Sequence, residues 1–396
     1  MNNRNKHIKQ TDHGMIRSFI KIAIVLFCSL LFIQSNTVTA QVINNNGAGI
    51  SVTNGVVMSS DSIKNSVGGL LTNDGTIDLS GTFINTGITI GKGTYNIAGD
   101  WTNTSIFNEE TSTVHFNGTN FQTITSPGGE TFYNLNVNNS GSSPVNRIIL
   151  SDNVYVSGTL SISQGNVVTG VYTLYLTNQT PASLNYTSLS GSRIIGLFER
   201  GVNGTGNYLF PLGSNSNYNP LNLTINTTPT AGSVLSEFIV ADLGSSGLPL
   251  PDPPVEVYQA FNDGYWSLIA NGFSSNDFNI NMDGAGFTPV VQNITRVIKR
   301  PSVGDWLLDG THSDAIDTVA YRNNLTGGIS ATGNHFGLGM ARPLVWDHPA
   351  DTAVCDGTNA FFKVVATGLD PLSYQWQEKR GAGWNNIYDA GIYSGT

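Results

Sequence analysis

Charged side chains are scarce in this 396-residue chain, in which Asp, Glu, Lys and Arg make up only 11% of the residues. About a quarter of a typical soluble domain is charged. Asn, Ser, Thr and Gly take the place of charge, in runs such as Asn44-Asn45-Asn46. Because 39% of the residues are hydrophobic, the low charge does not indicate a disordered tail. The sequence therefore predicts folded domains with an uncharged polar surface.

Residues with catalytic chemistry are also few, with six histidines and two cysteines in the chain. The sequence contains no His-Glu-x-x-His, no phosphate-binding loop and no Gly-x-Ser-x-Gly motif. His312 is the most suggestive histidine because Asp314 follows it, but a lone histidine in a polar turn predicts a turn residue. Residues 41–180 contain three scattered basic residues, which argues against a solenoid lyase with a carboxylate–metal cluster. We therefore expect no enzyme activity, no catalytic residues and no cofactor.

The first forty residues form a predicted signal peptide. A basic leader precedes the apolar run from Ile22 to Ile33, which is shorter than the ~20 residues needed to span a bilayer. Val38-Thr39-Ala40 fits a signal-peptidase site before Gln41. An uncleaved membrane anchor is the alternative. We expect a protein that is secreted or held at the outer cell surface, with no integral membrane span after cleavage.

Removal of this leader makes the chain more acidic. Thirteen Lys and Arg and 26 Asp and Glu follow Ala40, giving a formal net charge of −13. A nucleic-acid-binding surface needs clustered Lys and Arg to neutralise phosphates. The charge therefore excludes nucleic acid as an expected partner and leaves a surface glycan or a component of a neighbouring cell.

Residues 41–182 repeat short alternating segments separated by Gly and Asn. The segment Gly81–Thr86 (Gly-Thr-Phe-Ile-Asn-Thr) is echoed 18 residues later by Gly99–Thr104 (Gly-Asp-Trp-Thr-Asn-Thr). Strands of three to six residues with Asn at equivalent corners are typical of a β-solenoid, in which like residues stack between coils. A β-meander with similar hairpins is the alternative. Apolar spacing of 3.6 residues is missing, so no helix is expected after the signal peptide.

Residues 183–343 have longer strands at a spacing that suggests an antiparallel β-sandwich. Four prolines between Gly247 and Pro254 predict a stiff loop within this domain, because proline does not fit a central strand. Trp266 and Trp306 are expected in the core, with a sugar-stacking platform as the alternative. The aromatic residues proposed as possible ligand-stacking groups are Tyr258, Tyr265, Trp266 and Tyr321.

Residues 344–396 resemble the opening half of an immunoglobulin-like module. The resemblance rests on Cys355-Asp356-Gly357, the segment Ala360–Gly368, and Leu372–Gln377. It implies that Trp376 is the tryptophan of strand C and that Cys355 pairs with a cysteine on a later strand, absent from this chain. The expected fold is therefore all-β: a solenoid-like region, an antiparallel sandwich and a partial immunoglobulin-like sandwich. We expect the module to continue beyond Thr396.

The order of these regions resembles large secreted surface proteins of gliding and polysaccharide-degrading bacteria, which are exported by the type IX route. The segments that carry the resemblance are Phe116–Thr119, Phe132–Leu135, Tyr208–Gly213, Tyr218–Leu221, Gly264–Trp266, Lys299-Arg300, Trp306, Gly310–His312 and His335–Gly339. The C-terminal sorting domain of these proteins is missing from the sequence, and the resemblance supplies no catalytic residues.

Two classes of function follow from these observations. The first is a non-catalytic adhesin or structural spacer, and the alternative is a carbohydrate-binding accessory part of a secreted polysaccharide-degrading enzyme. Asn/Asp-Gly turns at Asp74, Asp263 and Asp283 offer oxygen ligands for a structural calcium ion. Their spacing is not that of a calcium loop, so these turns predict tight backbone turns first.

Overall fold

The computed structural model describes residues 41–187, 191–367 and 372–395, so the predicted signal peptide lies outside the described residues. Strands account for 52% of the chain and helix for 1%. The single helical element among the described residues is the 3₁₀ turn η1 (Pro181–Ser183). The prediction of an all-β fold is confirmed.

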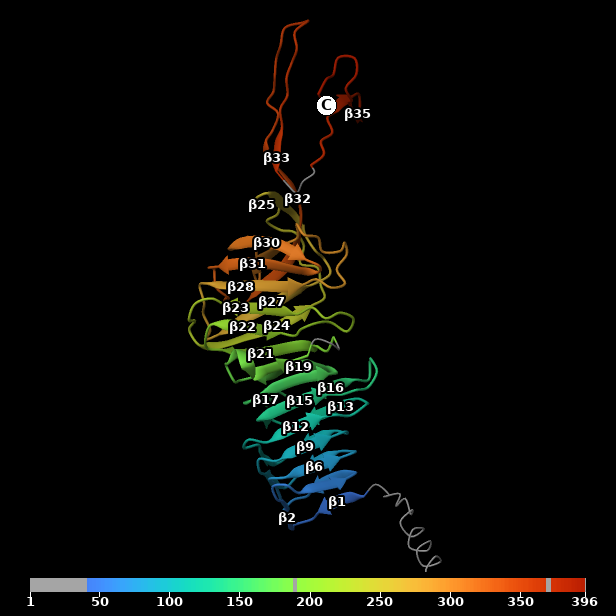
Figure 1. Cartoon of the computed structure of the whole chain (residues 1–396), viewed down its shortest axis with the longest axis vertical. Helices are drawn as coiled ribbons and strands as arrows, with labels where there is room; N and C mark the ends of the chain where they lie inside the picture. Colours follow the sequence, from blue (N-terminus) through green and yellow to red (C-terminus); the bar gives the residue numbers. More distant parts are fainter. Residues whose placement is uncertain (1–40, 188–190, 368–371, 396) are drawn as a thin grey trace, which may run out of the picture. The chain divides into compact units, whose positions relative to one another are not determined.

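The N-terminal region is a parallel β-solenoid of about eight turns, shown in blue to green in Figure 1. Sheet A contains β1 (Val42–Asn45), β4 (Ser62–Asn65), β7 (Phe83–Asn85), β10 (Trp101–Asn103), β13 (Gln122–Thr125), β14 (Glu130–Phe132), β16 (Arg147–Leu150), β17 (Val154–Val156) and β19 (Asn166–Leu176). Sheet B contains β2 (Gly49–Val52), β5 (Leu70–Asn73), β8 (Ile88–Ile90) and β11 (Ile106–Asn108). Sheet C contains β3 (Val57–Ser60), β6 (Thr76–Leu79), β9 (Thr94–Ile97), β12 (Thr113–Phe116), β15 (Asn134–Asn138), β18 (Leu160–Gln164) and β20 (Leu184–Tyr186).

The 18-residue echo in the sequence corresponds to one turn of this solenoid. Phe83 lies opposite Trp101, and Asn85 lies opposite Asn103, in the parallel pair of β7 and β10. The Phe83 and Trp101 rings stack with centroids 4.3 Å apart. Alternate residues of each strand point into the coil, so each turn buries a layer of side chains on the layer before it.

The next region is a sandwich of two antiparallel sheets. Sheet A continues through β21 (Ile194–Val202), β24 (Gly232–Ile239), β25 (Leu250–Asp252), β26 (Val255–Ala260), β27 (Tyr265–Asn271), β29 (Arg296–Pro301) and β32 (Asn334–Asp347). Sheet D contains β22 (Gly206–Phe210), β23 (Leu221–Ile225), β28 (Phe278–Asp283), β31 (Val319–Leu325) and β30 (Thr311–Ile316). The two sheets bury a shared core, in which the Phe198 and Phe210 rings meet edge to face at 5.9 Å.

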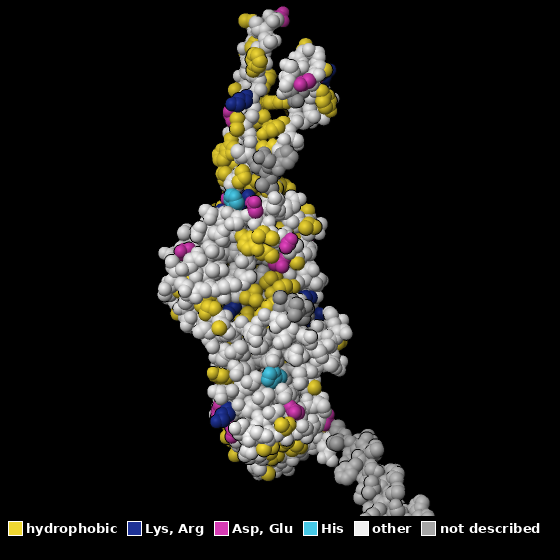
Figure 2. All heavy atoms as spheres, viewed as in Figure 1, with side chains coloured by type: hydrophobic (Ala, Val, Ile, Leu, Met, Phe, Trp, Pro, Cys, Tyr) yellow, Lys and Arg dark blue, Asp and Glu magenta, His cyan; other side chains and the backbone are white. Residues whose placement is uncertain are grey.

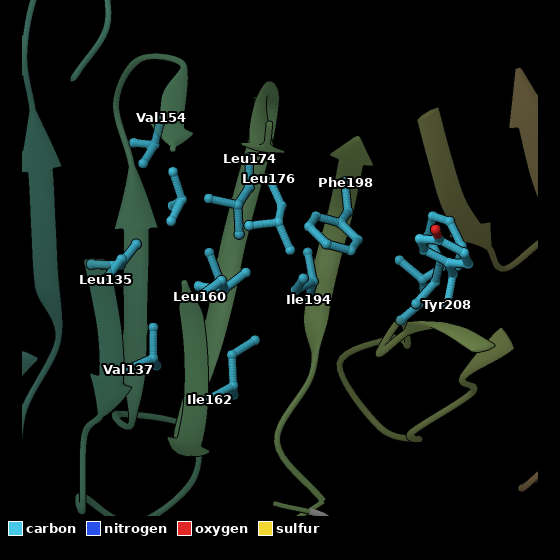
Figure 3. Packing of buried hydrophobic residues seen from close by; sticks show 14 of the residues in the cluster. Leu135, Val137, Val154, Leu160, Ile162, Leu174, Leu176, Ile194, Phe198 and Tyr208 are labelled. Carbon is cyan, nitrogen blue, oxygen red and sulfur yellow. The ribbon is translucent and has the colours of Figure 1, made fainter. Parts of the chain in front are cut away.

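Strand β21 belongs to both regions. It pairs in parallel with β19 of the solenoid and antiparallel with β24 of the sandwich. Figure 3 shows the buried side chains continuing from the coils, at Leu135 and Leu160, to Phe198 and Tyr208. Solenoid pairing continues past residue 182, because β20 pairs with β18. The solenoid and the sandwich therefore share one sheet and one hydrophobic core.

A buried arginine holds this junction together. Arg200 on β21 donates from Nη2 to the Pro181 carbonyl at 2.7 Å and from Nη1 to the Leu209 carbonyl. Its guanidinium lies 5.1 Å from the centroid of the Tyr208 ring. Burial lowers the pKa of Arg200 to about 10, so the side chain stays charged at neutral pH. One side chain thus ties the end of the last coil to the first hairpin of the sandwich.

The last described segment has little packing of its own. Beyond Leu344 it contains β33 (Val365–Thr367), β34 (Gln377–Arg380) and β35 (Gly383–Asn386), and β33 pairs with the end of β32. No described side chain after Leu344 is buried. Trp376 is half-buried and lines a hollow of about 520 Å³ with Val345, Val364 and Leu372.

Candidate functional surfaces

The three tyrosines proposed as ligand-stacking groups do not form one platform. Tyr265 on β27 lies with its ring centroid 4.7 Å from the ring of His335. Tyr258 on β26 is 38% exposed, and the Arg342 guanidinium lies 5.3 Å from its ring centroid. Tyr321 lies on β31 of sheet D, whereas the other two lie on sheet A. Each ring therefore has a different setting.

The structure corrects the alternative role of Trp266 as a ligand-stacking residue, because its side chain is fully buried and has no face open to a ligand. It alternates with Tyr265 along β27 and so points into the sandwich. Its Nε1 donates to the Asn219 carbonyl at 2.9 Å. Trp306 is 2% exposed and donates from Nε1 to the Gly244 carbonyl at 2.8 Å. Both tryptophans are core residues.

A buried ion network that the sequence did not reveal surrounds Asp252. Arg322 donates to both carboxylate oxygens of Asp252, at 2.6 and 3.3 Å, and Arg296 Nε lies 3.3 Å from Oδ2. His312 Nδ1 lies 3.5 Å from the same oxygen. Burial and the neighbouring Arg296 charge lower the pKa of His312, which keeps its ring neutral at pH 7. Asp252 therefore pairs with two buried guanidiniums, and Asp314 lies 3.9 Å from Arg296 Nη1 as a second carboxylate.

This network fastens the proline-rich segment to the sandwich. Asp252 ends β25, which pairs with β26 and contains one of the four prolines, Pro251. Arg322 also donates to the Gly310 carbonyl at 2.9 Å and to the Asp309 carbonyl at 2.9 Å. The histidine next to acids that the sequence singled out is part of this structural network.

The solenoid presents a regular polar face on sheet C. Two ladders cross β6, β9, β12 and β15, with outward side chains in register from coil to coil. We call this set the polar face: Thr76, Thr94, Thr113 and Asn134 in one ladder, and Asp78, Asn96, His115 and Asn136 in the other. All eight side chains are half-buried. In Figure 2 the side of the molecule that carries these strands is almost entirely neither hydrophobic nor charged.

Hydrogen bonds between neighbouring coils order the polar face. Asn136 Nδ2 lies 2.9 Å from His115 Nδ1, and Asn134 Nδ2 donates to Thr113 Oγ1 at 3.2 Å. Burial lowers the pKa of His115, so this ring is neutral at pH 7. The sequence signal for the face is the Thr-x-polar triplet, which begins at Thr76, Thr94 and Thr113.

Inside the solenoid a ladder of buried asparagines runs along one corner. Each Nδ2 donates to the Oδ1 of the next coil at 2.8 to 2.9 Å, through Asn45, Asn65, Asn85 and Asn103. The sequence predicts a solenoid from asparagines at equivalent corners, and the structure confirms that these asparagines stack from coil to coil.

The asparagine ladder ends on a buried carboxylate, Glu130. Asn103 Nδ2 donates to Oε1 at 3.3 Å and Trp101 Nε1 donates to Oε2 at 2.6 Å. The backbone N–H of Thr131 also donates to Oε1, at 3.2 Å. Burial raises the pKa of Glu130 to about 7, against the opposing effect of these three donors. Glu130 is thus a buried structural residue that accepts hydrogen bonds from groups inside the coil.

The side chains of the Asn/Asp-Gly turns considered for calcium accept hydrogen bonds from backbone N–H groups, among them Lys92 N–H to Asp74 Oδ1 and Thr288 N–H to Asp263 Oδ2. Asn73 Oδ1 accepts from the Gly75 N–H at 3.2 Å, and Asp283 Oδ1 accepts from the Ala285 N–H at 3.0 Å. Across residues 41–187, 191–367 and 372–395, no three His, Cys, Asp or Glu side chains gather closely enough to hold a metal ion. Cys355 is exposed and has a free thiol.

No family model, no curated protein and no solved structure matches this chain. Within the part of the chain that the structure describes, no helix is both long and apolar enough to cross a bilayer.

Proposed function

We propose that this chain is an exported, non-catalytic protein of the cell surface that acts as an adhesin or structural spacer. The observation that carries the proposal is the solenoid whose sheet continues into the sandwich through β21. Such a body spans distance with few residues per layer and displays the same side chain at each step.

The distance can be worked from strand spacing. Neighbouring strands lie about 4.8 Å apart, so eight stacked coils extend over roughly 34 Å. The shared core and Arg200 keep the coils and the sandwich from hinging at their junction. A spacer needs this stiffness, and an adhesin needs it to hold a binding face in a fixed orientation.

A carbohydrate-binding accessory role is the second candidate, and the polar face favours it. Hydroxyl and amide groups in register offer donors and acceptors to a polymer that repeats its own hydroxyls. Asp78 carries the one formal charge among the eight side chains at neutral pH, since His115 is neutral. This favours a neutral glycan over an ionic one.

Retention on insoluble polysaccharides separates the two candidates. The protein beginning at Gln41 is mixed with neutral polysaccharides and compared with Thr94→Lys on the polar face and Thr102→Lys on sheet A. Retention that is lost in Thr94→Lys and kept in Thr102→Lys supports the accessory role. If none of the three proteins is retained, the result supports a spacer or an adhesin that binds protein.

Fractionation of the producing cells tests export itself. We expect a surface or extracellular product whose first residue is Gln41, identified by mass spectrometry. A cytoplasmic product with an intact leader would overturn the proposal.

We also propose that residues 344–396 open an immunoglobulin-like module and that the protein uses type IX export. Trp376 and its apolar neighbours around the 520 Å³ hollow supply one wall of such a core. A second cysteine strand and a sorting domain encoded after Thr396 would support both points, and a different sequence there would remove them.

A further inference from the structure

The first coil of the solenoid leaves the end of the hydrophobic core open. Its inward side chains Ile43, Ile50 and Met58 are only half-buried. Their register partners in the second coil are 0 to 1% exposed, and these are Ile63, Leu71 and Ile77. Around this opening Val42 is 60% exposed and Val57 is 59% exposed. Figure 2 shows hydrophobic side chains gathered at the end that carries β1 and β2 in Figure 1.

The first coil also presents backbone edges at this end. Among the described strands, β1, β2 and β3 each pair on one side, with β4, β5 and β6. In β2 the Ala48 and Val52 carbonyls accept from the second coil, so the alternate residues Gly49 and Ser51 direct their backbone groups to the open side. The carbonyls of Val56 and Ser60 do the same for β3.

Nothing in this coil discourages pairing. Proteins usually protect exposed strand edges with lysine, proline or inward charges. Residues 41–60 contain no charged residue and no proline. The remainder of the exported chain is acidic, so this neutral end is where two copies approach without repulsion.

The opposite end of the solenoid determines the kind of assembly. There β19 already pairs with β21, which leads into the sandwich. In sheet A, head-to-tail stacking of coils is therefore blocked, which favours pairing of the open end with its own counterpart. Two like ends related by a twofold axis form a closed pair, with their edges antiparallel.

We propose that two exported chains associate through this coil, residues 41–60, by pairing strand edges and covering the open core. The proposal rests on the proposed removal of the leader before Gln41. Its chemistry is that of β-augmentation between identical edges, with apolar burial of the valines around it.

The test is the mass of the protein beginning at Gln41, measured by light scattering or sedimentation over a range of concentrations. We expect twice the chain mass. Val57→Lys places two like charges across the twofold axis and is expected to give the single-chain mass. Ile106→Lys is the matched control, because Ile106 is 55% exposed on β11 of the same solenoid, and it is expected to keep the doubled mass.

A single-chain mass for the unmodified protein at every concentration would overturn the pairing, as would species that grow beyond two chains. Equal disruption by Ile106→Lys would place the contact elsewhere. Ser51→Pro, which removes an N–H on the open edge, supplies a second variant should Val57→Lys fail to fold. The N-terminus of the exported product is measured separately, so retention of the leader is distinguishable from failure of the pairing.

Discussion

Replacing Glu130 with glutamine tests whether burial or hydrogen bonding has the larger effect on the pKa of this carboxyl, which lies at the end of the asparagine ladder. Three donors converge on this carboxylate, from Trp101, Asn103 and Thr131. Hydrogen bonding alone would favour the ionised form, whereas burial favours the protonated form. In the structure burial is the larger effect and raises the pKa from 4.5 to about 7.

The magnitude follows from this pKa difference. As pH rises from 4.5 to 7 the unfolded chain releases the proton while the folded chain retains it, so the folded state loses stability. The stabilisation is complete below pH 4.5 and is lost as pH passes through the folded pKa of about 7. One pKa unit corresponds to about 1.4 kcal/mol, so the loss is about 3 kcal/mol.

Urea unfolding across this pH interval provides the assay, with tryptophan fluorescence as the signal. Glu130→Gln is neutral at every pH at this position. The free energy of unfolding of the natural chain minus that of the variant should therefore fall by about 3 kcal/mol between pH 4.5 and pH 8. Glu110→Gln changes an exposed carboxylate and should leave the difference flat. A difference for Glu130→Gln that stays constant, or that grows with pH, would refute the reasoning, because growth means that the donors outweigh burial.

Two further substitutions test the asparagine ladder and the ion network. Asn85→Ala removes the acceptor of Asn65 Nδ2 and the donor to Asn103 Oδ1 and to the Ile106 carbonyl, and should cost about 3 kcal/mol of unfolding free energy. Asn108→Ala, on an exposed site of the same solenoid, should change it by less than about 0.5 kcal/mol in the same urea titration, and equal effects would contradict a structural ladder. Asp252→Asn removes the carboxylate that pairs with both buried arginines, leaving Arg296 with the more distant and more exposed Asp314, and should cost about 3–5 kcal/mol. Limited proteolysis should then cut the proline-rich segment faster, and an unchanged cleavage rate would argue against its attachment by this network.

The solenoid was predictable because its determinants recur at short intervals. The inward position of the coil is marked by the aromatic pair Phe83 and Trp101. The corner is marked two residues later, by Asn85 and Asn103. The spacing of 18 residues is long enough for one turn and short enough to recognise. Strand type and location follow from such local patterns.

The groups with the largest electrostatic effects were not predictable. Glu130 follows Asn103 by 27 residues, outside the spacing of the ladder it completes. Asp252 meets Arg322 across 70 residues. Such pairs depend on how sheets close over one another, and no local pattern marks them. For Trp266, alternation in the strand indicated the core, but only the structure shows that the ring is closed to ligands.

The two-sided pairing of β21 has a consequence for how this architecture can vary. Because β21 carries the strand pairing between the solenoid and the sandwich, the number of coils before it can change without altering that pairing. Inserting or deleting one turn between β1 and β16 shifts the reach of the molecule by about 4.8 Å. The length of the solenoid can thus change by one duplicated or deleted coil at a time, while its junction with the sandwich at β21 stays the same.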